Sequence, residues 1–562
     1  MTPRFRRLAV AGLLGGPVAG CVRPGVPPLA GTWTGELRHP RITLPLDIVI
    51  DSTGVAAKVT SRTWRLTAAP AKVRGSADSV EVVLVVDSDP ALGATGPGDT
   101  IRFRMRRGAA RWTGIGLRGP DTAAVELVRV DSAGAALLSN VSIASGRSDA
   151  PTSAEAPSAG PAVGTYRTAA GQLLAIAPFS EFGDRPMLID YAEGRIGPLI
   201  AVGPTRFLLG ASIVAPLFPA DTVDVTLGTD GAVTGLRWSR AGAAPVAADR
   251  VATVDSNLTF ANGAITLAGT LTRPALPGPY PALVLVHGSN AQTRDVFGPW
   301  ARYFAGLGFA VLAYDKRGTG ASSGDWKYAD FPALAGDALA AVRALAVRSD
   351  IRRDKIGLWG ISQAGWIMPL VAAEAPAEIG FMVVHAGTGT TVREQGVLNY
   401  RNELRFGGLP EDAVAIGMRY RTLDDSVTKA GGGVEPVRRF YEEHKATAPW
   451  LDEPAPADAW FRGYYRMLMD FDPRQAWERV ICPVLLFFGE LDANVPPAES
   501  WPPIERGLGR AGNRRVAQYT LPGANHVFLA AKTGAGDEYP GLSRFVPGYF
   551  DRMAQWLETN GR

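Results

Sequence analysis

Three residues in the C-terminal half of the chain have the types and the order needed for nucleophilic catalysis: Ser362, Asp492 and His526. A serine hydroxyl becomes a strong nucleophile when a histidine accepts its proton and a carboxylate orients that histidine. Asp492 comes directly after the apolar run 484–488, and His526 follows the strand-like segment 516–520. The expected chemistry is acyl transfer through a covalent intermediate on Ser362.

The residues around Ser362 predict a sharp turn between a strand and a helix. The segment 360–365 reads Gly-Ile-Ser-Gln-Ala-Gly and lies between the strand-like run 355–360 and a helical run that begins at Trp366. Such a turn needs small residues two positions either side of the serine, because neighbouring elements come very close. Ala364 stands where the G-x-S-x-G pattern has its second glycine, and alanine is small enough for the turn to form.

The elements that must position these residues alternate along the chain from about residue 260. Continuous apolar runs indicate buried strands, and longer periodic runs indicate helices between them. This alternation is typical of a largely parallel sheet with helices on both faces. The strand-like runs are 281–286, 309–314, 355–360, 381–384 and 484–488, and the helical runs are 296–307, 334–347 and 366–373.

Two further motifs follow the first two of these strands. His287 and Gly288 end the first strand, and the segment 315–322, Asp-Lys-Arg-Gly-Thr-Gly-Ala-Ser, follows the second. With five motifs in this order, residues 260–560 resemble bacterial carboxylesterases of the α/β-hydrolase superfamily, in particular those with an extra N-terminal β region. The resemblance implies an α/β-hydrolase fold, a mostly parallel sheet with helices on both faces and a helical cap. Within the second motif, Asp315 or Arg317 is expected to hold neighbouring loops.

The same resemblance assigns the oxyanion hole, the pair of backbone N–H groups that stabilises the negative oxygen of the transition state. One N–H belongs to Gln363, the residue after the nucleophile. The other comes from the loop after His287, where the resemblance selects Ser289, with Asn290 as the alternative. Glycine at position 288 lets the backbone approach the substrate.

Two residues compete for the roles of acid and base. Glu490 lies two positions before Asp492 and fits the spacing of the family less well. His385 also ends a strand-like run, but only His526, among the five histidines, falls after a late strand. The chain order Ser, Asp, His is the order that this fold uses. We therefore expect His385 to be structural.

An insertion of about eighty residues, 388–470, separates two of the predicted strands. It contains helical runs at 410–422 and 436–444 and several aromatic residues: Trp450, Trp460, Phe461, Tyr464 and Tyr465. In the resembled superfamily an insertion at this position forms a helical cap over the site. Most of these aromatic side chains are expected to form the core of the cap, and a few to line a substrate pocket.

The N-terminal half predicts β structure without a catalytic constellation. Residues 29–132 and 164–250 contain short strand-like runs separated by Gly, Pro, Asp and Ser, which is typical of a sandwich or barrel. Residues 142–161 are rich in Ser, Ala and Pro and predict a linker. The catalytic domain is expected at 251–560. The β regions are interpreted as a spacer, a lid support or a substrate-binding accessory, and the pattern leaves open whether they form one module or two.

The first twenty-one residues have the layout of a secretory signal peptide. Basic residues at 4–7 precede a short apolar stretch, 8–18, which is too short to span a bilayer. The stretch ends Val-Ala-Gly-Cys at 18–21, which resembles the bacterial lipobox, so lipidation of Cys21 would anchor the protein to a membrane of the cell envelope. A plain signal peptide is the alternative. Cys482, the only other cysteine, lies in an apolar run and is expected to be a buried hydrophobe.

Composition narrows the functional classes. The 562 residues carry a net charge of only +4, without the clustered basic residues of a nucleic-acid surface. No metal-ligand spacing occurs, and no cofactor is expected. The preferred function is a serine hydrolase that cleaves a small-molecule carboxylic ester. A serine peptidase of the same fold is the first alternative, and a surface lipoprotein that binds without catalysis is the second.

Overall fold

The computed structural model describes two compact units, one comprising residues 1–158, 199–224 and 238–245, the other residues 159–198, 225–237 and 246–562. The predicted signal peptide with Cys21 lies outside the described residues, as does the predicted linker up to residue 159. The described residues are 29–39, 42–61, 66–76, 78–86, 99–107, 111–118, 121–130, 160–182, 185–201, 203–210, 213, 221–240, 243–406, 408–535 and 542–562.

The first β region is a closed antiparallel barrel. Each strand pairs with the next, and β1 pairs with both β2 and β8, which closes the sheet. Successive side chains of each strand point alternately into the barrel and out to solvent. In β6, Phe103 and Met105 are buried, whereas Arg104 between them is exposed. Inside the barrel, Trp33 and Trp112 stack with ring centroids 3.6 Å apart. Its strands are β1 Gly31–His39, β2 Ile42–Ile50, β3 Ala56–Ser61, β4 Leu66–Gly75, β5 Ser79–Val86, β6 Asp99–Arg107, β7 Arg111–Arg118 and β8 Asp121–Val130.

The second β region forms a barrel of its own, so the two β regions are two closed sheets rather than one. Strand β9 pairs with both β10 and β16, which closes this barrel. Its strands are β9 Gly164–Thr168, β10 Leu173–Ala177, β11 Met187–Asp190, β12 Ile196–Ala201, β13 Arg206–Leu209, β14 Asp221–Leu227, β15 Val233–Ser239 and β16 Val246–Arg250. A short 3-10 helix, η3 (Ser180–Phe182), follows β10.

The predicted α/β region contains one eight-stranded sheet in the order β17-β18-β20-β19-β21-β22-β23-β24. The first two strands of this order run antiparallel to their neighbours, and the other six are parallel. Because the carboxyl ends of the parallel strands lie at one edge, the loops after them share that edge. The strands are β17 Thr253–Asn262, β18 Ile265–Pro274, β19 Tyr280–Val286, β20 Ala310–Tyr314, β21 Ile351–Ile361, β22 Phe381–His385, β23 Val484–Gly489 and β24 Val516–Leu521.

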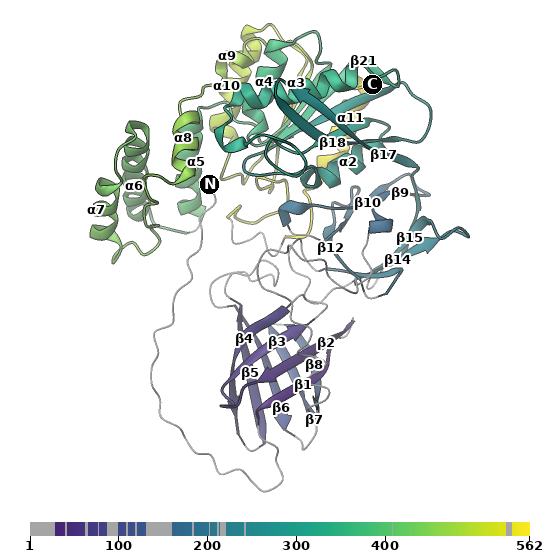
Figure 1. Ribbon diagram of the computed structural model, residues 1–562, viewed down its shortest axis with the longest axis vertical. Coiled ribbons are helices and arrows are strands. Elements are labelled where there is room, and N and C mark those ends of the chain that lie inside the picture. Colours follow the sequence, from purple (N-terminus) through teal and green to yellow (C-terminus); the bar gives the residue numbers. More distant parts are fainter. Residues whose placement is uncertain are drawn as a thin grey trace. The chain divides into compact units, whose positions relative to one another are not determined.

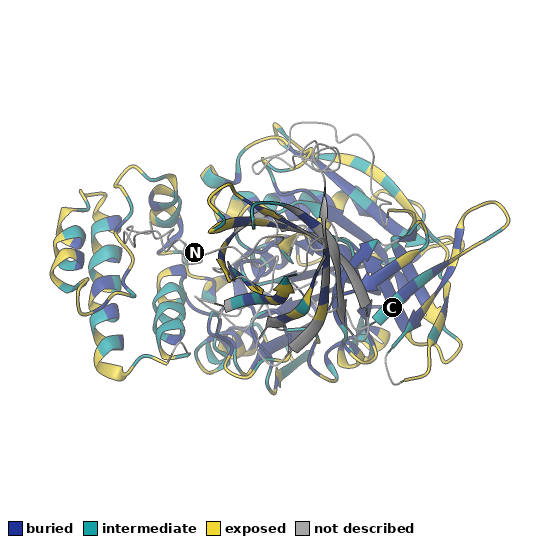
Figure 2. Ribbon diagram, turned by 90° about the horizontal axis from the view of Figure 1, so that it is seen from below, coloured by how far each residue is buried: buried dark blue, intermediate teal, exposed yellow. Residues whose placement is uncertain are grey.

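Helices cover both faces of this sheet (Figure 1), as the sequence predicts. One face carries α3 (Phe331–Ala346), α4 (Ala364–Glu374), α9 (Arg474–Trp477) and α10 (Pro497–Arg510). The other carries α2 (Gly298–Gly306) and α11 (Tyr549–Asn560), which are joined by a hydrogen bond from Trp300 Nε1 to Tyr549 Oη, 3.2 Å. The central strands are accordingly buried on both sides, as their dark blue colour in Figure 2 shows. No helix in the described part of the chain combines the length and apolar character needed to traverse a bilayer.

Four helices fill the predicted insertion and lie together to one side of the sheet (Figure 1). They are α5 (Val392–Phe406), α6 (Glu411–Ala430), α7 (Glu435–His444) and α8 (Trp460–Leu468). Tyr420, Val437 and Tyr441 form the centre of a small separate core, and Trp450 packs against it. Buried Arg462 fastens α8 to α6 by donating to Asp424 Oδ1 at 2.6 Å and Thr428 Oγ1 at 2.6 Å.

Helix α2 lies within the predicted helical run 296–307, and the second barrel covers its outer side. Nearly all of its residues are buried, and strands β9 and β10 pack against it. Thr165 Oγ1 donates to the carbonyl of Arg302 at 2.9 Å, and Arg167 donates to the carbonyl of Gly306 at 2.7 Å. At the start of the helix, a Cβ on Gly298 would lie 2.0 Å from the carbonyl oxygen of Pro178. The helix is therefore fixed between the sheet and the barrel.

Because the backbone of Pro178 lies so close to Gly298, one added methyl group at position 298 should destabilise the fold. Gly298→Ala should lower the thermal unfolding temperature of this unit, with a destabilisation of about 1–3 kcal/mol, because the backbone of Pro178 must move. Gly509→Ala in α10 is the matched control, since nothing lies within 4 Å of its Cβ position. Alanine there should be neutral or stabilising by up to about 1 kcal/mol. Equal unfolding temperatures for the two variants would contradict the proposed packing.

Candidate active site

The turn that carries Ser362 has the strained backbone expected of a nucleophile turn. Ser362 has φ of +59°, a left-handed conformation rare for residues other than glycine. Its backbone N–H donates to the carbonyl oxygen of His385 at 2.9 Å, which holds the turn to the end of β22. A Cβ on Gly360 would lie 2.4 Å from the Cβ of Ala364. The alanine methyl therefore fits only because position 360 is glycine.

Gly365 leaves room for a second close contact at this turn, with the loop after β22. A Cβ there would lie 2.4 Å from the Cα of Gly387, in the loop after β22. The glycine that the sequence pattern places one position late thus serves the close contact between helix α4 and the neighbouring loop.

Asp492 and His526 are brought together by the loops after β23 and β24. His526 Nδ1 donates to Asp492 at 3.0 Å to Oδ1 and 2.9 Å to Oδ2. The Asp492 carboxylate is buried and also accepts from the N–H groups of Asn494, 2.9 Å, and Val495, 2.8 Å. These bonds fix the carboxylate, which in turn fixes the tautomer of the imidazole and leaves Nε2 free to accept a proton.

Electrostatics favour the cationic form of His526. Burial would lower the pKa of His526, but the charge of Asp492, its hydrogen bond and the charge of Glu181 together raise that pKa above the usual value of 6.5. Among the described residues no hydrogen bond joins Ser362 Oγ to His526. Ile361 and Val527, the sequence neighbours of these two residues, line one pocket.

The rival acid and base are placed elsewhere. Glu490 Oε2 accepts from the backbone N–H of Gly523 at 2.8 Å, so it supports the loop before His526. His385 is fully buried, with Nδ1 at 2.9 Å from Tyr549 Oη. Burial lowers the pKa of His385 to about 3, which keeps it neutral. The structure therefore pairs Asp492 with His526 and gives Glu490 and His385 structural contacts.

The loop after β19, which carries the predicted oxyanion donor Ser289, is organised by a lysine to which the sequence analysis gave no role. Buried Lys316 donates through Nζ to the carbonyls of Gly288, 2.9 Å, and Asn290, 3.0 Å, and to Gln363 Oε1, 2.9 Å. One ammonium group thus joins the loop that carries Ser289 to the residue after the nucleophile. Burial lowers the pKa of Lys316 to about 7. Within the described part of the chain, the backbone N–H groups of Ser289 and Gln363 have no hydrogen-bond partner.

The neighbours of Lys316 hold loops, as the sequence predicts for this motif. Asp315 accepts two bonds from the Arg294 guanidinium, 3.0 and 2.7 Å, and one from the N–H of Ala321, 2.9 Å. Arg317 binds both carboxylate oxygens of Asp337 in α3 at 2.6 Å. His287 donates through Nε2 to a backbone carbonyl at 2.7 Å, and burial lowers its pKa to about 3.

The cap reaches this centre through helix α8. Gln363 Nε2 donates to Tyr464 Oη at 3.1 Å, and Tyr464 and Trp460 both pack edge-on against Trp326 at 5.4 and 5.3 Å. Tyr465 instead accepts from Arg421 of α6 at 2.7 Å. The predicted cap aromatics thus divide between the core of the cap and the neighbourhood of the nucleophile turn.

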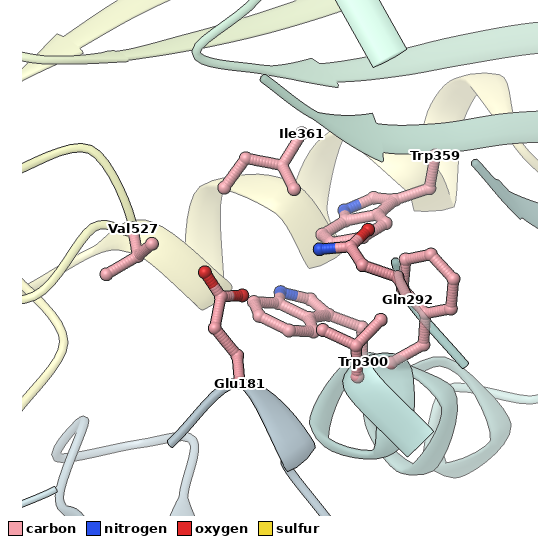
Figure 3. A pocket seen from close by; sticks show the side chains of 8 residues that line it. Glu181, Gln292, Trp300, Trp359, Ile361 and Val527 are labelled. Carbon is pink, nitrogen blue, oxygen red and sulfur yellow. The ribbon is translucent and has the colours of Figure 1, made fainter. Parts of the chain in front are cut away.

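A small pocket lies beside the turn that carries Ser362 (Figure 3). Most of its wall is apolar or aromatic, but Glu181 of η3, from the second barrel, points its carboxylate into it. No sequence signal identified Glu181, because its place depends on the packing of the barrel. The lining residues are Glu181, Gln292, Val296, Phe297, Trp300, Trp359, Ile361 and Val527. The described residues contain no group of three or more His, Cys, Asp or Glu side chains arranged to hold a metal.

The pairing of Asp492 with His526 predicts a measurable shift. In Asp492→Asn the pKa of His526 should fall, because the lowering effect of burial then acts without the charge and the charge-assisted hydrogen bond of Asp492. Titration by NMR with histidine labelled in the imidazole ring would report it, and His287 and His385 should stay neutral throughout. Glu490→Gln is the matched control and should leave the His526 midpoint in place. An unchanged pKa of His526 in Asp492→Asn would contradict the pairing of these two side chains.

Comparison with known proteins agrees with this geometry. Residues 283–533 match the Alpha/beta hydrolase family. Esterase EstD of Thermotoga maritima is 24% identical over 345 residues, covering 59% of this chain and 75% of EstD. An uncharacterized peptidase, YtmA of Bacillus subtilis, is 27% identical over 173 residues, covering 30% of this chain and 66% of YtmA.

Solved structures show a similar region. A Pyrococcus furiosus esterase, Pf2001, is 16% identical with a TM-score of 0.36, covering 55% of this chain and 92% of that protein. A proline iminopeptidase of Mycobacterium smegmatis is 16% identical with a TM-score of 0.35, covering 54% of this chain and 99% of that one. The family match over 283–533, together with the strand order and the turn at Ser362, shows that this part of the chain is an alpha/beta hydrolase domain.

Proposed function

We propose that this α/β hydrolase is a serine esterase that cleaves carboxylic esters through an acyl-enzyme on Ser362. The observation that carries the proposal is the buried, hydrogen-bonded pair Asp492–His526, which the loops after β23 and β24 bring together. The similarity to a protein named an esterase, EstD, supports an ester over other substrates.

The proposed cycle has two halves. His526 accepts the proton of Ser362 as the hydroxyl oxygen attacks the ester carbonyl, and Asp492 stabilises the imidazolium. The backbone N–H groups of Gln363 and Ser289 donate to the tetrahedral oxyanion. His526 then gives its proton to the leaving alcohol, and the C–O bond breaks. In the second half, water gives a proton to His526 as its oxygen attacks the carbonyl of the acyl-enzyme. The bond to Ser362 Oγ then breaks, His526 returns the proton to Ser362, and the acid leaves.

Hydrolysis of p-nitrophenyl esters from acetate to palmitate tests this proposal. Ser362→Ala should lower turnover about 10³-fold or more, because nucleophile and base act as a unit. Ser426→Ala, an exposed serine of α6 that donates to the carbonyl of Thr422, is the matched control and should keep full activity. Activity that survives in Ser362→Ala would exclude this nucleophile.

The alternatives give different results in the same assay. The similarity to YtmA makes a peptidase the second candidate, and faster turnover of amides than of esters would favour it. Absence of turnover together with absence of Ser362 labelling by a fluorophosphonate would favour a binding protein without catalysis.

We also propose that the protein is exported and anchored through a lipid on Cys21, on the strength of the lipobox-like segment 18–21. In a bacterial host, Cys21→Ser should move the protein out of the detergent-extracted membrane fraction or leave it unprocessed. Cys482→Ser is the matched control and should remain in the membrane fraction, because Cys482 is buried. Mass spectrometry that finds an unmodified Cys21 in the mature protein would contradict the anchor.

A further inference from the structure

Helix α5 of the cap carries two amide side chains that contact the loop with Asp492: Gln395 and Asn402. They are seven residues apart, which is about two helical turns, so both lie on one side of the helix. Asn402 is buried, although most residues of α5 are partly exposed. A buried amide costs free energy unless its polar atoms are hydrogen-bonded. The partners of these two side chains therefore indicate what they do.

Gln395 reaches the carboxylate of Asp492 through one peptide group. Its Nε2 donates to the carbonyl oxygen of Asn494 at 2.8 Å. The nitrogen of that same peptide group is the backbone N–H of Val495, which donates to Asp492 Oδ1 at 2.8 Å. Because a peptide group is planar and rigid, a hydrogen bond that fixes the direction of its C=O also fixes the direction of its N–H.

Asn402 makes the same connection through the preceding peptide group. Its Nδ2 donates to the carbonyl oxygen of Ala493 at 3.3 Å. The nitrogen of that group is the N–H of Asn494, which donates to Asp492 Oδ1 at 2.9 Å. A carbonyl that accepts a hydrogen bond also makes the N–H of its own group a stronger donor, because hydrogen bonds in a chain polarise one another. Two N–H groups that hold Asp492 are thus held in turn by amides of α5.

Helix α5 is attached to its surroundings by other contacts as well. The backbone N–H of Arg393 donates to the carbonyl oxygen of Met469 at 2.9 Å, and Arg401 forms an ion pair with Glu499 of α10 at 3.2 Å. The helix also packs along α6. It should therefore stay in place when one of its two amides is replaced, so that such a substitution tests the hydrogen bond itself.

We propose that the two amides of α5, Gln395 and Asn402, are positioning residues that hold the Asp492 carboxylate against the catalytic histidine. This inference rests on the proposed esterase function and adds a part for the cap in that function. The path runs from each amide through one peptide group to Asp492 Oδ1, and Oδ2 of the same carboxylate lies 2.9 Å from His526 Nδ1. The insertion between β22 and β23 thus supports the acid and the base as a pair.

The pKa of His526 reports whether the carboxylate is held in place. Burial lowers that pKa, whereas the charge and hydrogen bond of Asp492 and the charge of Glu181 raise it. Glu181 lies on η3 and is unchanged in the test. A carboxylate that moves away loses part of its effect on the imidazole, so Gln395→Met should lower the pKa of His526 by about half a unit or more. Titration by NMR with histidine labelled in the imidazole ring measures it.

Kinetics give a second readout. With p-nitrophenyl acetate, Gln395→Met should lower kcat about tenfold and leave KM nearly unchanged, because an oriented histidine acts in the transition state. Adding Asn402→Leu should lower both kcat and the pKa of His526 further. Thermal unfolding of each variant shows that the protein measured is folded.

Arg401→Met is the matched control, since it removes a different contact between α5 and α10. It should leave the pKa of His526 and kcat unchanged. An equal fall of that pKa in Arg401→Met and Gln395→Met would overturn the inference, because the attachment of the whole helix would then be responsible.

An unchanged pKa of His526 in the folded double variant Gln395→Met, Asn402→Leu would also overturn it. So would a raised pKa, because the peptide groups would then only withdraw charge from the carboxylate. If the double variant does not fold, the titration of Gln395→Met decides, since Gln395 is only partly buried. The titration needs no substrate, so a failure of the esterase function in the ester assays leaves this test in force.

Discussion

The buried ammonium of Lys316 is the interaction on which the geometry of this site depends. Three oxygen atoms, on Gly288, Asn290 and Gln363, accept its three protons, so that a charge deep in the protein is fully hydrogen-bonded. An unpaired charge there would cost several kcal/mol, roughly, in the absence of these acceptors. Because the acceptors belong to two loops, after β19 and after β21, a single side chain sets the distance between them. Both predicted oxyanion donors lie on those loops.

The same network extends into the cap. Gln363 uses its amide oxygen for Lys316 and its amide nitrogen for Tyr464, so the residue after the nucleophile connects the sheet to helix α8. Trp326 lies against both Lys316, 5.4 Å from its ring centroid, and Tyr464. The cap otherwise has its own small core and several surface ion pairs. Its position over the nucleophile turn therefore depends on a few polar and aromatic contacts.

The sequence was sufficient for the fold of the α/β region and for the choice of Ser362, Asp492 and His526 as candidates, because these follow from local patterns and chain order. Apolar runs identify strands covered on both faces, and the turn at Ser362 needs small residues at fixed offsets. Lys316 and Glu181 escaped prediction for a different reason. The sequence analysis gave Lys316 no role, because its function depends on two loops that are distant in the chain and meet only in the folded structure. The alternation of apolar and polar residues along the N-terminal strands shows which side chains face the interior. It does not show that the strands close into two separate barrels.

The contact between Gly298 and Pro178 also bears on how such a chain can evolve. Proteins often gain or lose accessory modules at exposed linkers, where few contacts cross the junction. Here the compact unit that contains the sheet also contains residues 159–198 of the second barrel, and helix α2 is buried beneath it. Recombination at the apparent boundary near residue 251 would strip an apolar helix of its cover. The sheet and the part of the second barrel that covers α2 are therefore expected to be inherited together.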